Sequence, residues 1–460
     1  MMNWVCSILI LLISICGRAI KGRWSNLLTV FAGFYGTTFF LANMRLNKTN
    51  AASDNASMVI FIGIFSFFIA YLIVIFIYQR KQKYAYVGIR LTEQGKTSID
   101  CSLIINRHTL KVAIIVVSAY TLYRLYVLFT LLRMGYSYAM IRTIYFNSNF
   151  IFDADVATLY GRNQLDIYFI QPALLAIMII ACICYFTDAL HLSKRKKIGI
   201  IVLTFLLAAI TGISNGGREI IFYFILLFMF SYVIFRKKGF FAGKDLSFAK
   251  SQKRLIRRVT FFAIIIVSVM TFSRTESGTN PIVEMFQTVY IYFTGYIPHL
   301  SYRLDCIPSG ELTYGYAYIL GLIKLPAAVL HRVFDVPTSQ AFSIAEALTS
   351  DLQDRVSIGG GYTFNAYVSL FYYFYRDFGY LSLIAESFIF GFVCATIERR
   401  FERKATYLNI FAYLFCFYLI ISSMVRWEMV HPKSAMLLYF LPFFFVRRNK
   451  CDVLPSEESK

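Results

Sequence analysis

Apolar runs of membrane-spanning length follow one another along most of the chain, and they restrict its possible folds more than any other feature. A helix needs about 17 to 25 predominantly apolar residues to cross a hydrocarbon core. Eleven candidate stretches, several of them short, lie at 3–16, 27–44, 58–78, 111–132, 167–188, 198–213, 219–235, 259–272, 379–397, 406–424 and 435–446. The sequence therefore predicts an all-α polytopic membrane protein of about eleven transmembrane helices, within a range of 10–13, as one integral membrane domain over residues 1–460.

The basic residues indicate which loops face the cytoplasm, because cytoplasmic loops of membrane proteins are rich in Lys and Arg. Of the 46 Lys and Arg residues, 31 fall in alternate loops at 17–26, 79–111, 189–198, 236–258 and 398–405 and in the tail from 447. We therefore expect the N-terminus outside and the C-terminus in the cytoplasm. The net charge of +21 then reflects topology and attraction to anionic lipid. No RNA- or DNA-binding motif accompanies it, so we expect no nucleic-acid partner.

The segment 273–378 is expected to form a large outer loop, because it is too polar and too often broken by Gly and Pro to be a string of spans. Within it, 281–300 and 314–330 are apolar at a helical spacing, which predicts interfacial or re-entrant helices. Alternatively they form a pair of true spans, which would leave the downstream orientation unchanged. Their many Tyr and Phe residues fit an aromatic belt at the membrane interface or, for a few, a platform for sugar rings.

Arginines recur in this outer loop and indicate an anionic ligand at the membrane surface. They are Arg274, Arg303, Arg332, Arg355 and Arg376. A guanidinium group presents a planar fork of N–H donors that can hold two phosphate oxygens at once. We therefore expect a phosphate-bearing ligand on the outer side.

The Ser-Asn-Gly-Gly-Arg turn at 214–218 is a second candidate for binding phosphate. It separates two apolar runs that are together too long for one span, and Asn-Gly-Gly favours a turn. The N–H groups of Gly216 and Gly217, at a helix N-terminus beside the cation of Arg218, would suit a phosphate. Alternatively, Arg218 is only a helix-end arginine that reaches toward water. Arg274, just after the eighth predicted span, repeats the pattern.

A Gly-rich stretch from Gly359 to Asn365 precedes a Tyr-rich stretch that ends in Arg376 and Asp377 at the start of a span. An ionisable pair at the mouth of a span is a candidate for function, although the two residues could also cap the helix. The following Asp-Phe-Gly string is no kinase motif, because no kinase core surrounds it. The glycines follow no predicted strand, whereas the glycines of a nucleotide-binding fingerprint come directly after one.

The sequence predicts neither a metal site nor a cofactor. Asp153-Ala154-Asp155 has the spacing of a divalent-metal motif, but two carboxylates alone fit a solvated loop better. The five histidines form no His-Glu-x-x-His motif, and the nine cysteines form no Cys-x-x-Cys pair and imply no structural disulfide. Without a Walker loop or a Gly-x-Ser-x-Gly elbow, ATP-driven transport and serine hydrolysis are disfavoured.

Along nearly its whole length the chain resembles the bacterial O-antigen polymerases, the Wzy-type oligosaccharide repeat-unit polymerases. The similarity lies in the number of spans, the large late outer loop, the basic inner loops and two short motifs. The motifs are the Ser-x-Gly-Gly-Arg turn at 214–218 and the run from Gly359 through Asn365 to Tyr375-x-Asp377-Phe378-Gly379, with Gly391 and Arg399-Arg400 after it.

The resemblance implies glycosyl transfer at the periplasmic face of a bacterial inner membrane, with a periplasmic N-terminus and a cytoplasmic C-terminus. The fold would be similar to the GT-C-like polyprenyl-phosphate glycosyltransferases. A growing glycan would pass from undecaprenyl pyrophosphate to the non-reducing-end sugar of another lipid-linked repeat unit. The implied partners are undecaprenyl-pyrophosphate-linked oligosaccharide, membrane lipid and a chain-length regulator protein.

Such a reaction needs cations to hold the pyrophosphate and a base for the attacking hydroxyl. The candidate bases are Asp351, Asp377, Glu276 and His299. The candidate substrate-binding residues are Arg218, Arg274, Arg303, Arg355, Arg376, Gly216, Gly217 and Asn365. Because a lipid pyrophosphate lies at one membrane depth, we expect Arg218, Arg274 and the segment 351–377 to meet in one site.

Three other functions fit parts of the pattern. An O-antigen ligase would share the outer arginines and differ in its acceptor, lipid A core. A lipid-linked glycan flippase or other transporter would place charged residues along a path through its spans, yet Arg124 is the only basic residue inside a predicted span. A structural scaffold would not need so many outer arginines.

Overall fold

The computed structural model is mostly helical. It describes residues 2–85, 103–146, 163–187, 189–217, 219–235, 281–308, 311–352, 354–365 and 367–447, together with residues 254, 257, 258, 261 and 265. The predicted span at 259–272 and the predicted metal-like motif at 153–155 therefore lie largely or wholly outside the described residues.

Seven helices in the described part of the chain are long and apolar enough to cross a membrane. They are α1 (Met2–Lys21), α3 (Asp54–Ala85), α4 (Arg107–Arg133), η2 (Asp166–Ile170) continuing into α7 (Gln171–Phe186), α8 (Lys194–Asn215), α13 (Tyr316–Phe334) and α16 (Tyr380–Arg403). Three shorter apolar helices are α2 (Leu27–Asn43), α9 (Glu219–Phe235) and α17 (Tyr407–Ser422). The predicted all-α polytopic membrane class is confirmed, whereas the total of about eleven spans stays a prediction.

Polar residues at the ends of the apolar runs determine where several helices begin. The side chain of Asn26 accepts a hydrogen bond from the Thr29 N–H (2.7 Å) at the start of α2, and that of Thr406 accepts one from the Asn409 N–H (3.1 Å) at the start of α17. Asn106 caps α4 in the same way. Such side chains satisfy N–H groups that have no partner within the helix, so the sequence sets these boundaries locally.

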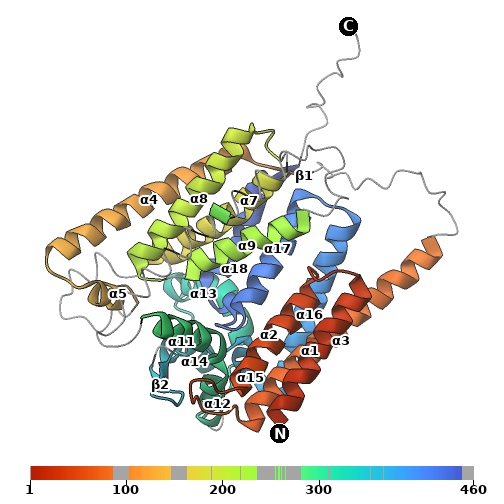
Figure 1. Ribbon diagram of the computed structural model, residues 1–460. Coiled ribbons are helices and arrows are strands. Elements are labelled where there is room, and N and C mark those ends of the chain that lie inside the picture. The colour runs from red at the N-terminus through yellow and green to blue at the C-terminus, as the bar shows by residue number, and fades with distance from the viewer. Residues whose placement is uncertain are drawn as a thin grey trace.

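The helices form two groups joined by α17 (Figure 1). In one group, α1, α2, α3 and α16 (Tyr380–Arg403) pack together, and Gly391 of α16 lies so close to α3 that a Cβ atom there would overlap the Phe67 backbone. In the other, α4, α7, α8 and α9 pack together with α18 (Pro432–Phe444). Because α17 contacts α2 as well as α7 and α9, the apolar core is continuous between the groups.

The short helices gather at one end of the molecule (Figure 1). They are α5 (Tyr138–Phe146), α11 (Pro281–Thr294), α12 (Tyr296–Asp305) and α14 (Gln340–Asp351). At the opposite end, β1 (Leu103–Ile105) pairs antiparallel with β4 (Phe445–Arg447). We call the end with the short helices the outer end, because the distribution of basic residues predicts it to face away from the cytoplasm.

The two apolar stretches of the outer loop, both predicted as interfacial or re-entrant, differ in structure. Residues 281–305 are divided at Gly295 into α11 and α12, each too short to cross a membrane. The face of α11 that carries Val283, Phe286 and Val289 is exposed, as in an interfacial helix. By contrast, α13 is long and apolar enough to span. If the two stretches formed a pair of spans, only α13 would be long enough to cross the membrane.

The glycines at 359–361 form the turn of a small hairpin between β2 (Val356–Ser357) and β3 (Thr363–Phe364). Gly359, Gly360 and Gly361 have φ values of 88°, 62° and 79°, which favour glycine. The hairpin docks on the loop between α2 and α3, where the Asn50 N–H donates to the Ile358 carbonyl oxygen (2.7 Å). A Cβ atom on Gly359 or Gly360 would overlap this loop, so backbone packing accounts for these two glycines.

Candidate functional site

A partly buried cluster of charged side chains lies at the outer ends of α9, α17 and α18. It consists of Glu219, Arg426, Glu428 and Lys433, which we call the outer charge cluster. Glu219 is the first residue of α9, and the other three come from the segment that joins α17 to α18 and from the first turn of α18. Pro432, in the first turn, favours a new helix start there. Charged groups in such an apolar bundle are costly and mark candidate functional sites.

Each cation of the cluster contacts both carboxylates. The Arg426 Nε lies 3.1 Å from Glu428 Oε1, and its Nη2 lies 3.4 and 3.3 Å from the two oxygens of Glu219. The Lys433 Nζ lies 3.3 Å from Glu219 Oε1 and 3.3 Å from Glu428 Oε2. The four side chains therefore form a closed ring of ion pairs with no net charge.

The two carboxylates of the ring differ in their surroundings. The Glu428 side chain is fully buried and also accepts hydrogen bonds from the Tyr418 hydroxyl (2.9 Å) and the Ser434 hydroxyl (3.1 Å). Burial alone would raise the pKa of Glu428, but Lys433 and Arg426 outweigh it and hold that pKa below its usual range. By contrast, the Glu219 side chain is 36% exposed. Glu428 is thus a fixed anion, whereas Glu219 is accessible from outside the ring.

The outer loop is tied to this cluster through backbone and aromatic contacts. The N–H groups of Val368, Ser369 and Leu370 donate to the carbonyl oxygens of residues 425, 424 and 423 at 3.0, 3.0 and 2.7 Å. The Trp427 indole N–H donates to the Tyr318 carbonyl oxygen of α13 (2.7 Å), and the two rings stack with centroids 5.3 Å apart. The outer loop and α13 therefore help to fix the segment that carries Arg426 and Glu428.

Two of the predicted site residues, His299 and Arg303, contact each other on α12. His299 is fully buried, and its Nδ1 lies 2.9 Å from the Tyr367 carbonyl oxygen. Its Nε2 accepts a hydrogen bond from the Arg303 Nε (3.1 Å), so Nδ1 must be the donor and the ring is neutral. Arg303 also donates to the Asp354 carbonyl oxygen (3.3 Å). In this arrangement the pair fastens the loop 354–367 to α12, and His299 could act as a base only after Arg303 moved.

We expect His299 to make the protein less stable in mild acid. Burial, together with the neighbouring Arg303, lowers the pKa of His299 to about 4, despite its hydrogen bond to a carbonyl oxygen. An unfolded chain has a histidine pKa near 6.5, so the stabilisation is complete above about pH 6.5 and is lost as the pH falls toward about 4. The free energy of unfolding lost over this pH range amounts to about 3 kcal/mol. Unfolding in detergent should show a steeper pH dependence for wild type than for His299→Gln. If the free energy of unfolding depends on pH equally in the two proteins, the lowered pKa of His299 does not contribute to acid sensitivity.

Arg376 and Asp377 lie in α15 (Leu370–Phe378) and are both buried, but their side chains point to different contacts. The Arg376 Nη2 lies 3.4 Å from Glu311 Oε2. Asp377 accepts hydrogen bonds from the Thr313 hydroxyl (2.5 Å) and from the N–H groups of residues 317 and 318 (both 3.1 Å). Asp377 therefore caps α13 rather than the helix that follows it, and both of its carboxylate oxygens already accept hydrogen bonds.

The glycines of the 214–218 turn have a different backbone role from the one expected. Gly216 has φ 65° and ends α8, and its N–H lies 3.2 Å from the Ile213 carbonyl oxygen. The Gly217 N–H donates to the Gly212 carbonyl oxygen (3.0 Å). Both N–H groups therefore cap the C-terminus of α8, and in this conformation they already donate to its carbonyl oxygens. Chain geometry explains the difference, because a hairpin turn must first satisfy the carbonyl groups of the helix it ends.

The other predicted site residues are only partly described. Arg355 is exposed and Asn365 is half-buried. Asp351 is the last residue of α14, but its side chain lies outside the described residues. Arg218, Arg274 and Glu276 also lie outside the described residues, so the meeting of Arg218 and Arg274 in one site stays a prediction.

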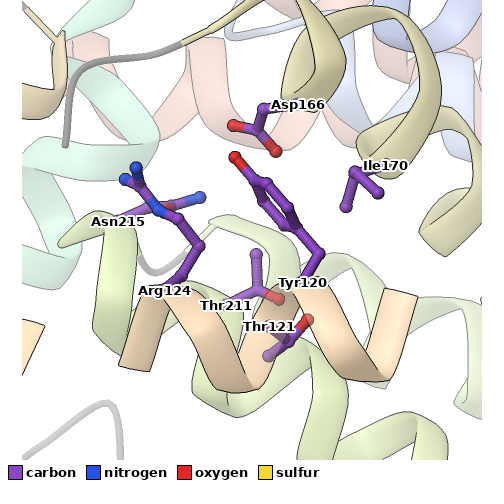
Figure 2. A pocket seen from close by; sticks show the side chains of 7 residues that line it. All are labelled: Tyr120, Thr121, Arg124, Asp166, Ile170, Thr211 and Asn215. Atoms are coloured by element: carbon purple, nitrogen blue, oxygen red, sulfur yellow. The ribbon is translucent and has the colours of Figure 1, made fainter. Parts of the chain in front are cut away.

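A small pocket with polar side chains on its wall lies between α4, η2 and the end of α8 (Figure 2). Arg124 and Tyr120 project from α4 toward Asp166 of η2 and Asn215 of α8, around a cavity of about 10 Å³, enough for about one water molecule. Asp166 is buried and accepts hydrogen bonds from the Tyr145 hydroxyl (2.7 Å) and the Gln171 amide (3.0 Å). The guanidinium of Arg124 lies 4.9 Å from the centre of the Tyr145 ring. The intramembrane arginine noted in the sequence thus belongs to a polar network.

Sequence reasoning did not select any member of the outer charge cluster as a site residue. A signal was present, because Arg426, Glu428, His431 and Lys433 crowd into the short interval between the predicted spans 406–424 and 435–446. A loop of that length needs no such concentration of charge. Among the described residues, no three His, Cys, Asp or Glu side chains converge as metal ligands.

Comparison of the chain with protein-family models, curated proteins and solved structures finds no match. The resemblance to the O-antigen polymerases therefore stays a hypothesis. It rests on the motifs and the membrane organisation.

Proposed function

We propose that the protein is a membrane glycosyltransferase that polymerises undecaprenyl-pyrophosphate-linked oligosaccharide repeat units at the periplasmic face of a bacterial inner membrane, in a GT-C-like architecture. The outer charge cluster carries this proposal. Its two cations, Arg426 and Lys433, lie at the outer ends of apolar helices. The cluster begins with Glu219, the residue directly after the Ser-x-Gly-Gly-Arg turn that resembles the polymerase motif.

The proposed reaction requires charge stabilisation and proton transfer, and the cluster offers groups suited to both. The hydroxyl oxygen of the acceptor sugar attacks the anomeric carbon of the donor, and the bond from that carbon to the pyrophosphate oxygen breaks. Negative charge then develops on the leaving pyrophosphate, where fixed cations in a poorly hydrated site are most effective. A carboxylate within hydrogen-bond reach would take the hydroxyl proton. Glu219, which is partly exposed beside both cations, joins Asp351, Asp377, Glu276 and His299 as a candidate for that role.

Reconstitution with lipid-linked repeat units tests the proposed function. The purified protein in liposomes should convert undecaprenyl-pyrophosphate-linked repeat units into a ladder of longer glycans.

Lys433→Met should slow ladder formation about 100- to 1,000-fold, by analogy with the loss of one transition-state donor. Arg218→Ala and Arg218→Lys should both lose much of the activity, because neither side chain has the guanidinium fork. Arg133→Ala, which removes an exposed cation at the outer end of α4, is the matched control.

The same assay separates the alternative functions. Transfer that requires lipid A core as acceptor would identify a ligase. Movement of the lipid-linked unit across the bilayer without a new glycosidic bond would identify a flippase. Either result, or full ladder formation by Lys433→Met, would reject the mechanism proposed for the cluster.

A further inference from the structure

We propose that the Glu219 carboxylate occupies a built-in anion site between Arg426 and Lys433, and that a phosphate or pyrophosphate group of a ligand displaces it. The proposal rests on the proposed function for the choice of anion. The site itself rests on the geometry of the ring. Glu219 would then be a resident stand-in for the ligand.

The first argument is that the donors converge. The Arg426 Nη2 and the Lys433 Nζ lie 3.4 and 3.3 Å from the same oxygen, Glu219 Oε1. Two cationic donors from different parts of the chain therefore define one position for an anionic oxygen. An oxygen of a phosphate group carries the same charge character and accepts the same donors.

The second argument is that Glu428 can hold the cations in place when Glu219 leaves. Glu428 is fully buried and contacts Arg426 at 3.1 Å and Lys433 at 3.3 Å. Hydrogen bonds from the Tyr418 and Ser434 hydroxyls also hold the Glu428 carboxylate in place. Without Glu219 the cluster would carry two cations and one carboxylate, so an incoming anion would meet a net positive charge at positions already fixed.

The third argument is that Glu219 is the more exposed and the less firmly held of the two carboxylates. Its contacts with Arg426 and Lys433 measure 3.3 to 3.4 Å, longer than the roughly 2.7 to 2.9 Å of strong charge-assisted hydrogen bonds. Its side chain is 36% exposed, whereas the side chains of Arg426 and Lys433 are only 14% and 12% exposed. Displacement therefore moves one partly hydrated side chain and leaves the buried groups in place.

The location of the ring favours a ligand that carries its phosphate at the membrane surface. Arg426 lies just after the end of α17 and Lys433 in the first turn of α18, and the Lys433 Nζ lies 5.9 Å from the centre of the Tyr223 ring. A lipid-borne pyrophosphate and a free pyrophosphate share the same recognition chemistry. The experiment below distinguishes the two sources.

Binding of pyrophosphate to the full-length protein in an uncharged detergent tests the proposal. Inorganic pyrophosphate and a short-chain polyprenyl pyrophosphate are titrated separately by calorimetry, without an acceptor, so no turnover is needed. Removing the competing carboxylate in Glu219→Gln should tighten binding on the order of tenfold, since displacing it costs a weak ion pair with each of two cations. Adding Lys433→Gln to this variant should reverse the gain.

Glu346→Gln is the matched control, because Glu346 is 39% exposed and forms an ion pair with Lys324 (2.9 Å) on α13 and α14. Tighter binding of the inorganic anion assigns the site to the phosphate group itself, and tighter binding of the lipid form alone assigns it to a lipid-borne ligand. An equal gain in Glu346→Gln, or no gain for either ligand, would overturn the proposal. If Glu219→Gln does not yield folded protein, Glu219→Ala removes the same carboxylate. Failure of the ladder assay leaves this binding result unaffected.

Discussion

Replacing Arg426 with alanine should both destabilise the protein and abolish ladder formation. The substitution removes a cation that contacts two carboxylates and leaves Glu428 fully buried with Lys433 as its only ion-pair partner among the described residues. Breaking a buried ion pair by removing one partner costs about 3 to 5 kcal/mol. We therefore expect the free energy of unfolding in mixed detergent micelles to fall by that amount.

Two further variants separate charge from shape at this position. Arg426→Lys keeps the charge but lacks the fork that reaches both Glu219 and Glu428, so it should recover only part of the loss. Arg133→Ala, at an exposed position, should stay within about 0.5 kcal/mol of wild type. Wild-type stability in Arg426→Ala would show that the outer charge cluster does not hold the ends of α9, α17 and α18 together.

Replacing Glu398 with alanine should destabilise the opposite end of the molecule by a similar amount, about 3 to 5 kcal/mol. Glu398 of α16 is fully buried and accepts hydrogen bonds from the Arg23 guanidinium (2.6 Å), the Leu27 N–H (3.0 Å) and the Tyr71 hydroxyl. Its loss would leave those donors without their shared acceptor. The contacts join α16 to α2, α3 and the residues after α1, so the first helical group should loosen as a unit.

The thermal unfolding temperature and the yield of folded protein measure this second effect. Glu398→Gln keeps the shape and the acceptor oxygen, so it should lose less stability than Glu398→Ala. Glu346→Gln, at a partly exposed ion pair, should change stability by about 1 kcal/mol or less. If Glu398→Ala unfolds no more readily than Glu346→Gln, the buried contacts of Glu398 do not stabilise the bundle.

The membrane class and several local features could be predicted from the sequence, because they depend on neighbouring residues. Apolar length alone identifies α1, α3, α4 and α8 as possible spans. The contact between His299 and Arg303 joins residues four positions apart on one helix, a spacing at which side chains are neighbours. By contrast, no strand was predicted before the glycines at 359–361, yet they form the turn of a hairpin after β2.

The predicted roles of the polar residues were harder to infer, because a single residue type serves several purposes. Asp377 looked like a residue at the mouth of its own span, yet it caps α13, whose first turn lies about 60 positions earlier in the sequence. The Gly216 and Gly217 N–H groups cap α8, because its terminal carbonyl groups are the nearest acceptors. A sequence shows which groups can donate or accept, but their partners depend on packing.

By itself, the sequence determined that this chain forms apolar helices, where several of them begin, and which loops carry the positive charge. Only the tertiary structure placed Glu219 against Arg426, which is 207 positions away. The physical reason is that apolar length and helix capping are local properties, whereas a bundle brings helix ends together through side-chain packing along their whole lengths. Charged side chains that are distant in sequence meet at these poorly hydrated helix ends, where each is stable only with an ion-pair partner. The outer charge cluster is the result.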